Sequence, residues 1–149
     1  MIVKVSEKHL EDMVPLFDGY RVFYEQPSDS DAARAFLKQR LSLKDSVIFM
    51  AISDNGEAAG FTQLYPSFSS VAMQRVYILN DLYVKSAFRG QGVGASLMNH
   101  AKAFARTQNA RGLTLETAID NPAQHLYERL GWVKDTEVFH YTWETKSES

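Results

Sequence analysis

The strongest chemical signal in this sequence is a run of alternate glycines, Gly90, Gly92 and Gly94, preceded by Arg89. Residues 79–84 alternate and carry Tyr and Val, which predicts a strand, and the residues after the glycines have helical spacing through Thr107. The first amides of a helix lack partners within the helix, and its dipole favours negative charge there. Glycines let a phosphate approach these amides, and an arginine can pair with it. The stretch therefore predicts a phosphate-binding loop.

Two common nucleotide-binding loops do not match this run. A P-loop ends in Gly-Lys-Ser or Gly-Lys-Thr, which the chain lacks here. The dinucleotide fingerprint is excluded because position 95 is alanine. Both folds also need several βαβ units, which the remaining sequence does not supply. A tight glycine turn that only starts a helix is the alternative interpretation.

The pattern Arg-x-x-Gly-x-Gly, met by Arg89, Gly92 and Gly94, resembles the pyrophosphate loop of the GNAT N-acetyltransferases. A second segment, residues 121–132, is similar to the family's C-terminal "Asn…Ala…Leu/Phe-Tyr-Glu-x-x-Gly-Phe/Trp" motif. Leu-Asn-Asp-Leu-Tyr-Val and Leu-Tyr-Pro-x-Phe-Ser-Ser further resemble the branch with yeast histone and polyamine acetyltransferases and their bacterial relatives. The resemblance covers nearly the whole chain.

This resemblance implies acetyl-CoA as cosubstrate and transfer of its acetyl group to a primary amine of a small molecule or a lysine side chain. The amine would attack directly, since the chain has no cysteine to carry the acetyl group. Strands 79–84 and 113–118 would splay at a bulge near residues 83–85. The expected cofactor contacts are Leu82, Tyr83, Val84, Arg89, Gly90, Gln91, Gly92, Val93, Gly94, Ala95 and Asn121. Asn121 stands six residues before Tyr127 rather than seven, and capping a helix is its alternative role.

Two catalytic residues are predicted. Tyr127 in the C-terminal motif is the candidate proton donor to the coenzyme A thiolate, with core packing as the alternative. A substrate ammonium must also lose a proton, because its pKa is about 10.4. In polyamine acetyltransferases a Glu does this one position before the equivalent of Asp81, where this chain has Asn80. Asp81 and Glu116 are the remaining candidate bases, and strand alternation would place Asn80 and Asp81 on opposite faces.

The acceptor site is expected between the first two helices and the loop of the middle strands. Its predicted lining includes Tyr24, Glu25 and Tyr65, with Tyr20 and Phe68 beside them. Aromatic rings and a carboxylate suit a cationic amine. The alternative for each is plain core packing. The four histidines have no ligand spacing, so no metal site is predicted.

Composition limits the other function classes. The 149 residues are 45% hydrophobic with a net charge of -2, as expected for one globular domain that does not bind nucleic acid. There is no apolar run for a signal peptide or membrane span, so a cytoplasmic protein is expected. A homodimer is predicted from the family and from the apolar strand at 138–143. The alternative function is an inactive GNAT-fold module that senses acyl-CoA or binds another protein.

The predicted fold class is α+β: one GNAT domain over residues 1–149, with a mixed, mostly antiparallel sheet splayed at its middle and about four helices. Helices are expected after Ser6 with a break at Asp18-Gly19, and then at 29–43, up to Thr107 and after Asn121. Strands are expected at 1–5, 47–52, 58–65 with an end at Pro66, 74–84, 113–118 and 133–143.

Overall fold

The computed structural model describes residues 1–145, and the chain forms two compact units. The first unit, residues 1–117, contains nearly all regular structure. Its strands are β1 (Ile2–Lys4), β2 (Val47–Ile52), β3 (Ala58–Ser69), β4 (Gln74–Val84) and β5 (Leu113–Thr114). Its helices are α1 (Leu10–Phe23), α2 (Ser30–Leu43) and α3 (Val93–Thr107), with 3₁₀ turns at Glu7–His9 and Ser86–Phe88. The second unit contains α4 (Gln124–Arg129).

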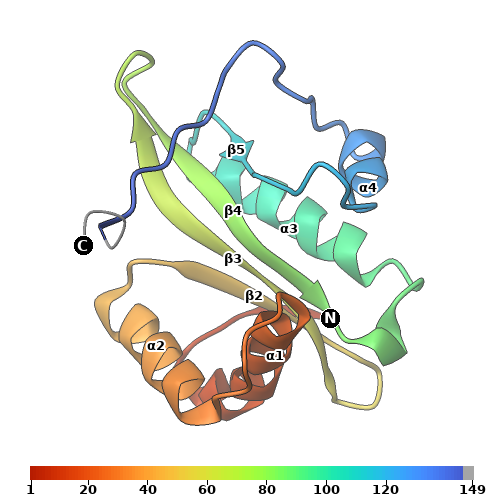
Figure 1. The fold of residues 1–149 in the computed structure, drawn as a ribbon. Coiled ribbons are helices and arrows are strands. Elements are labelled where there is room, and N and C mark those ends of the chain that lie inside the picture. Colours follow the sequence, from red (N-terminus) through yellow and green to blue (C-terminus); the bar gives the residue numbers. More distant parts are fainter. Residues whose placement is uncertain (146–149) are drawn as a thin grey trace. The chain divides into compact units, whose positions relative to one another are not determined.

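The sheet of the first unit has the order β1-β2-β3-β4-β5 (Figure 1). The pairs from β1 to β4 are antiparallel, whereas β5 lies parallel to β4. The predicted mixed, mostly antiparallel sheet with about four helices is therefore confirmed.

Two apolar layers bury the faces of this sheet. On one face, Phe61 of β3 packs against Phe17 of α1 within a core that also takes residues from α2. On the other face, Phe49 of β2 stacks edge-on against Phe104 of α3. Burial of large apolar side chains on both faces fixes the register of the central strands, because a slip of one residue would move each of them to the opposite face, into a layer packed around different side chains.

A β-bulge at Asn80 interrupts the pairing of β3 and β4. Gln63 pairs with Asp81 and Leu64 pairs with Leu79, so Asn80 is the extra residue. The pairing of β4 with β5 covers only Tyr77 and Ile78, so the two strands separate after Ile78. The predicted splay is present, but the predicted bulge near 83–85 is wrong. The register of β3 sets the position of the bulge, and the sequence of β4 alone does not contain it.

Helix α1 continues through Asp18-Gly19 to Phe23, so the predicted break is wrong. Asp18 accepts hydrogen bonds from the Ser28 hydroxyl and the Asp29 amide, at 2.6 and 2.8 Å, which tie the helix to the start of α2. At Gly19 the Tyr83 hydroxyl lies 3.0 Å from where a Cβ would stand. The glycine is therefore a close-approach position inside the helix and does not end it.

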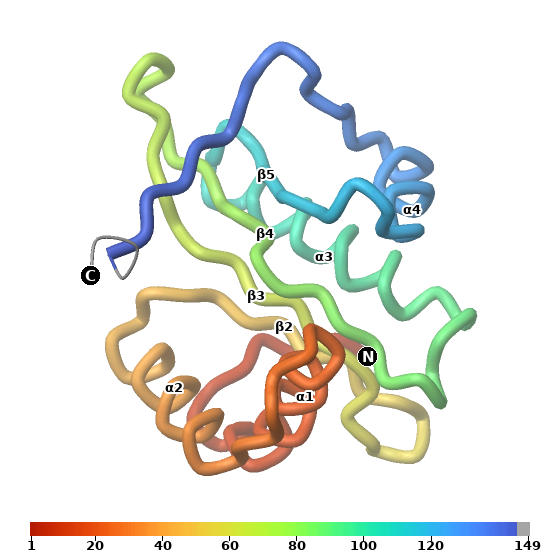
Figure 2. The backbone as a smooth tube through the Cα atoms, viewed as in Figure 1, coloured from red at the N-terminus to blue at the C-terminus, as the bar shows by residue number. Residues whose placement is uncertain are grey.

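Strand β3 also passes its predicted end at Pro66 and reaches Ser69. Pairing with β2 stops at Leu64, and Pro66 pairs only with Tyr77 of β4. A proline is tolerated there because its missing N–H faces an edge with no strand partner. Figure 2 shows β3 and β4 extending past β2 as a hairpin.

In the second unit, α4 ends before Gly131, which has a φ of +88°. The predicted strand at 133–143 is wrong, since the structure has no strand there. An Asx turn lies within the segment, where the Glu137 amide donates to Asp135 at 2.9 Å. Apolar side chains at odd and at even positions of this segment are exposed alike, so the alternating pattern does not produce one buried face. The exposed fractions are 92% for Val133, 68% for Val138 and 90% for Phe139. Within residues 1–145, no helix has the length and apolar content needed to cross a membrane.

Candidate active site

The glycine loop leaves a row of backbone amides at the start of α3. Gly90 and Gly92 have φ values of +76° and +81°, and no atom lies within 4 Å of a Cβ built on either. Within residues 1–145, the amides of residues 90–95 donate no hydrogen bond. The hydrogen bonds of α3 begin with the Ser96 amide, which donates to the Gly92 carbonyl. Such amides at the N-terminus of a 15-residue helix fit an anionic group such as a pyrophosphate.

Arg89 lies at the entry to this loop and is held in place from two sides. Its Nε donates to the Val84 carbonyl at 2.9 Å, and its guanidinium lies 5.5 Å from the ring centre of Phe23 and 5.9 Å from that of Tyr83. Within the described chain, its two terminal nitrogens make no hydrogen bond. The predicted contact of Arg89 with a phosphate stays a prediction.

The end of β4 offers a backbone edge beside the loop. Lys85 donates to Ala59 at 2.9 Å, so by antiparallel alternation Tyr83 also directs its N–H and C=O toward β3. Leu82 and Val84 direct theirs to the other edge, where pairing with β5 has already ended. The Val84 carbonyl accepts from Arg89, so within residues 1–145 the amides of both residues and the Leu82 carbonyl remain available to a ligand.

The bulge at Asn80 decides which way Asp81 points. Before the bulge, Tyr77 faces α3, where its ring lies 5.3 Å from that of Phe104. After it, Tyr83 faces α1, near Tyr20 and Phe61. Without the extra residue, positions 81 and 83 would lie on the α3 side. The bulge thus places the Asp81 side chain on the α1 side of the sheet.

Asp81 is almost completely buried, with 2% of its surface exposed. Gln63 Nε2 donates to its Oδ2 at 2.5 Å, and Asn80 Nδ2 donates to its Oδ1 at 2.7 Å. The expectation that Asn80 and Asp81 point to opposite faces is therefore wrong, because the bulge breaks the alternation. Burial raises the pKa of Asp81, while the hydrogen bonds from Asn80, Gln63 and the Tyr20 hydroxyl lower it in part.

Two tyrosines, Tyr20 and Tyr65, lie near this carboxyl group on the α1 side, and Tyr24 packs against Tyr20. The Tyr20 hydroxyl lies 3.4 Å from the Asn80 carbonyl oxygen, and its ring lies 5.1 Å from that of Tyr24. Burial, followed by the negative charge of Asp81, raises the pKa of Tyr20, and the same two causes raise the pKa of Tyr65 to about 12. Tyr20 and Tyr65 are therefore neutral hydroxyl donors at physiological pH.

The structure does not bring all predicted acceptor residues together. Glu25 follows α1 in a left-handed conformation with φ +64° and is exposed. Phe68 has the opposite parity to Tyr65 on β3, so it lies on the other face, where Arg75 stacks on it at 4.2 Å. Phe68 is thus wrongly placed in the predicted lining. Glu116, the other candidate base, is exposed two residues after β5.

The second unit contains Asn121 and Tyr127. Asn121 Oδ1 accepts from the Ala123 amide at 2.9 Å, so this side chain makes the turn that leads into α4. Tyr127 is half-buried on α4, and its ring centre lies 6.4 Å from that of Trp132. A contact between either residue and a cofactor stays a prediction.

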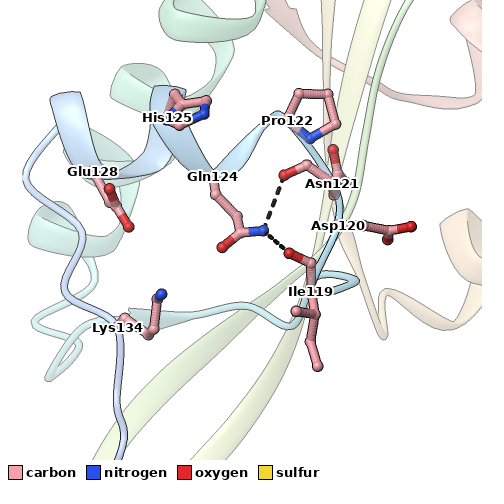
Figure 3. A pocket seen from close by; sticks show the side chains of 8 residues that line it. All are labelled: Ile119, Asp120, Asn121, Pro122, Gln124, His125, Glu128 and Lys134. Atoms are coloured by element: carbon pink, nitrogen blue, oxygen red, sulfur yellow. Dashed lines mark hydrogen bonds between the residues drawn. The ribbon is translucent and has the colours of Figure 1, made fainter.

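A polar pocket of about 520 Å³ lies next to α4 (Figure 3). Gln124 points back from the helix to the preceding loop, where it donates to the Asn121 carbonyl at 3.1 Å and to that of Ile119. The pocket lining is Ile119, Asp120, Asn121, Pro122, Gln124, His125, Glu128 and Lys134.

Sequence reasoning missed Gln63 and the role of Asn80 as a donor. The signal for Gln63 was present: Thr62 and Gln63 are adjacent polar residues inside the apolar strand 58–65, and both are completely buried. Buried polar side chains are normally hydrogen-bonded, so a polar pair there indicates a partner on the neighbouring strand.

Comparison with known proteins identifies close relatives. The model of the acetyltransferase (GNAT) family matches residues 10–132. The uncharacterized N-acetyltransferase YhfO of Bacillus subtilis is 51% identical over 130 residues, which is 87% of each chain. A probable acetyltransferase of Haemophilus influenzae is 30% identical over 139 residues, and this alignment covers 85% of this chain and 95% of the relative. The crystal structure of a probable acetyltransferase, 43% identical, superposes with a TM-score of 0.92 over 97% of both chains.

Proposed function

The chain belongs to the GNAT family of acetyltransferases, and we propose that its glycine loop, the free edge of β4 and the buried Asp81 together perform acetyl transfer. The protein is an N-acetyltransferase that moves the acetyl group of acetyl-CoA to an amine. The observation that carries the assignment of the site is the row of amides at residues 90–95 that donate no hydrogen bond within residues 1–145, beside the edge of β4 beyond its pairing with β5.

Acetyl-CoA supplies a thioester that an amine nitrogen can attack. We assign its pyrophosphate to the amides of residues 90–95 and to the terminal nitrogens of Arg89. The pantetheine arm contains amide groups, and the open backbone groups of Leu82 and Val84 can pair with them as a strand would. A backbone amide at this edge is also suited to stabilise negative charge that develops on the thioester oxygen.

Asp81 is the proposed acceptor of the proton that the substrate ammonium must lose. Burial raises its pKa, which makes the carboxylate a better proton acceptor. Because Asp81 is buried, the proton passes to it through the hydroxyl of Tyr20 or through water beside Asn80, which is exposed. The attacking nitrogen is then neutral and has a free lone pair.

Tyr127 is the proposed donor of a proton to the departing thiolate. The ordinary pKa of tyrosine is about 10 and that of a thiol about 8.5, so the transfer is mildly uphill in isolation. A hydrogen bond shared with the thiolate is sufficient to assist its departure. Asn121 is the proposed further contact to acetyl-CoA from the same unit.

The acceptor is proposed to be a cationic primary amine, either on a small molecule or on a lysine side chain. Tyr24 and Tyr65, with Tyr20, offer aromatic faces and hydroxyl groups near one buried carboxylate. Aromatic rings attract cations, and the charge of Asp81 adds to that attraction. Glu25 at the end of α1 is the proposed outer carboxylate that attracts the amine.

We further propose that residues 1–149 act as one domain of a cytoplasmic homodimer. The family model spans residues 10–132 and so includes parts of both units. Val138, Phe139 and Tyr141 have at least 68% of their surfaces exposed, which is unusual for large apolar side chains and suits a subunit contact.

The acceptor proposal is tested by steady-state kinetics on a panel of amines. Tyr24→Leu should raise KM for the amine and leave the Kd for acetyl-CoA unchanged. Tyr141→Phe, at an exposed tyrosine of the other unit, is the control and should change neither constant. If Tyr24→Leu leaves KM for every amine unchanged, the acceptor does not bind at these tyrosines.

A further inference from the structure

Gln63 has one polar atom without a partner in a completely buried position. Its Nε2 donates to Asp81, whereas its Oε1 makes no hydrogen bond within residues 1–145. Gln63 has 0% of its surface exposed, so bulk solvent does not supply the missing donor. An unpaired buried acceptor is costly, and natural proteins rarely keep one without a reason.

The reason becomes apparent when both charge states of Asp81 are considered. An ionised carboxylate only accepts hydrogen bonds, and Asp81 receives them from Gln63 and Asn80. A protonated Asp81 carries an O–H that needs an acceptor instead. The unpaired Oε1 belongs to the same carboxamide as the donating Nε2, and a half-turn of that group exchanges the two atoms.

We propose that Gln63 is a positioning residue that serves both protonation states of Asp81: its Nε2 holds the carboxylate, and its Oε1 receives the O–H of the acid. This inference rests on the proposed role of Asp81 as the base. The N–H bond of the substrate ammonium breaks, its electron pair stays on nitrogen, and the proton forms an O–H bond on the Asp81 carboxyl. The proton later leaves to solvent and Gln63 turns back.

Among the described groups that face Asp81 from the surrounding elements, Gln63 alone is completely buried and has an unpaired acceptor. From α1, the Tyr20 hydroxyl faces it, with Tyr24 behind. From β3, Gln63 lies opposite, and Tyr65 lies further along the strand, within reach of Arg40 and Asp45. From β4 itself, Asn80 donates. Thr62 touches Asp81 only at its backbone carbonyl, at 2.8 Å.

The test is the pH profile of kcat/KM for acetyl transfer in variants at position 63. Gln63→Met removes both polar atoms, and we expect a fall in kcat of about tenfold or more, because a general base contributes about 10²–10⁴-fold and its proton would be poorly accommodated. Gln63→Glu keeps the shape but adds a carboxyl group. It should move the acid limb to higher pH, because two adjacent carboxyl groups oppose each other's ionisation.

Thr62→Val is the matched control. It removes a buried hydrogen bond to the backbone carbonyl of Asp81 and leaves the hydrogen bonds to the Asp81 carboxyl group in place. It should lower the melting temperature and leave the pH profile unchanged. Asp81→Asn should abolish the acid limb and lower kcat about 100-fold or more.

Each outcome has a definite meaning. If Asp81→Asn keeps the rate and the acid limb, Asp81 is not the base and both proposals fall. If Asp81→Asn loses the rate and the acid limb while Gln63→Glu keeps the wild-type rate and the wild-type acid limb of the pH profile, only the proposed role of Gln63 is overturned. Because Gln63→Glu is isosteric, it preserves the test even if Gln63→Met does not fold.

Discussion

Replacing Gly92 with alanine should weaken acetyl-CoA binding far more than it weakens the fold. Gly92 has a φ of +81°, and nothing lies within 4 Å of where the new Cβ would stand. The cost to the fold is therefore only that of a left-handed conformation, about 1–2 kcal/mol. For a chain of this length, this corresponds to a melting temperature lower by about 2–8 °C.

The cost to binding comes from the direction of the amides. Relaxing the strain at position 92 turns the neighbouring N–H groups away from the pyrophosphate. A hydrogen bond to a charged group is worth about 1.5–3 kcal/mol, so losing one raises the Kd about 10- to 150-fold.

Gly56 provides a matched control in the hairpin between β2 and β3. Its φ is +82°, and it too has no atom within 4 Å of a built Cβ. Gly56→Ala should therefore lose the same stability and keep the wild-type Kd. Thermal unfolding and calorimetric titration with acetyl-CoA measure the two quantities. Equal affinities for the two variants, after equal losses of stability, would refute the role of the loop.

Three further perturbations test the role of Tyr127, the register of β3 and β4, and the hydrogen bonds of Asp18. Tyr127→Phe should slow acetyl transfer with little change in the Kd for acetyl-CoA; an equal loss of both would exclude a role as proton donor. Gly60→Ala should lower the free energy of unfolding by about 1–3 kcal/mol in urea, because its Cβ would stand 2.6 Å from the Tyr83 carbonyl oxygen; an unchanged midpoint would contradict the register of β3 and β4. Hydrogen bonds from Ser28 and Asp29 lower the pKa of Asp18 below 3.8, so its stabilisation is present above that pH and is lost as the pH falls through the lowered value. Asp18→Asn should thus melt below wild type at pH 7, with a gap that closes below about pH 4; a gap that persists in acid would assign the loss to packing.

The sequence predicted those parts of the fold that depend on local signals. The bounds of β4, its passage into the glycine loop and the start of the helix predicted at 29–43 all follow from residues within a few positions. The unpaired amides at 90–95 follow in the same way, because glycines and a helix start expose them.

Features that depend on a neighbouring element were not predicted. The bulge at Asn80 depends on how β3 aligns with β4, and it turns Asp81 toward α1. Helix α1 continues past Gly19, and the glycine there leaves room for the Tyr83 side chain from β4. The partnership of Gln63 with Asp81 is a contact across strands, for which the only local sign is a polar residue in an apolar run.

The central claim is acetyl transfer from acetyl-CoA to an amine, and its most direct test follows both products in one reaction. Purified protein is incubated with acetyl-CoA and each member of an amine panel, with thiol release followed optically and the acetylated amine identified by mass spectrometry. We expect at least one amine to yield one free thiol for each acetyl group it gains, at a rate that Asp81→Asn lowers about 100-fold or more. Thiol release without an acetylated amine, or no saturable binding of acetyl-CoA, would contradict it.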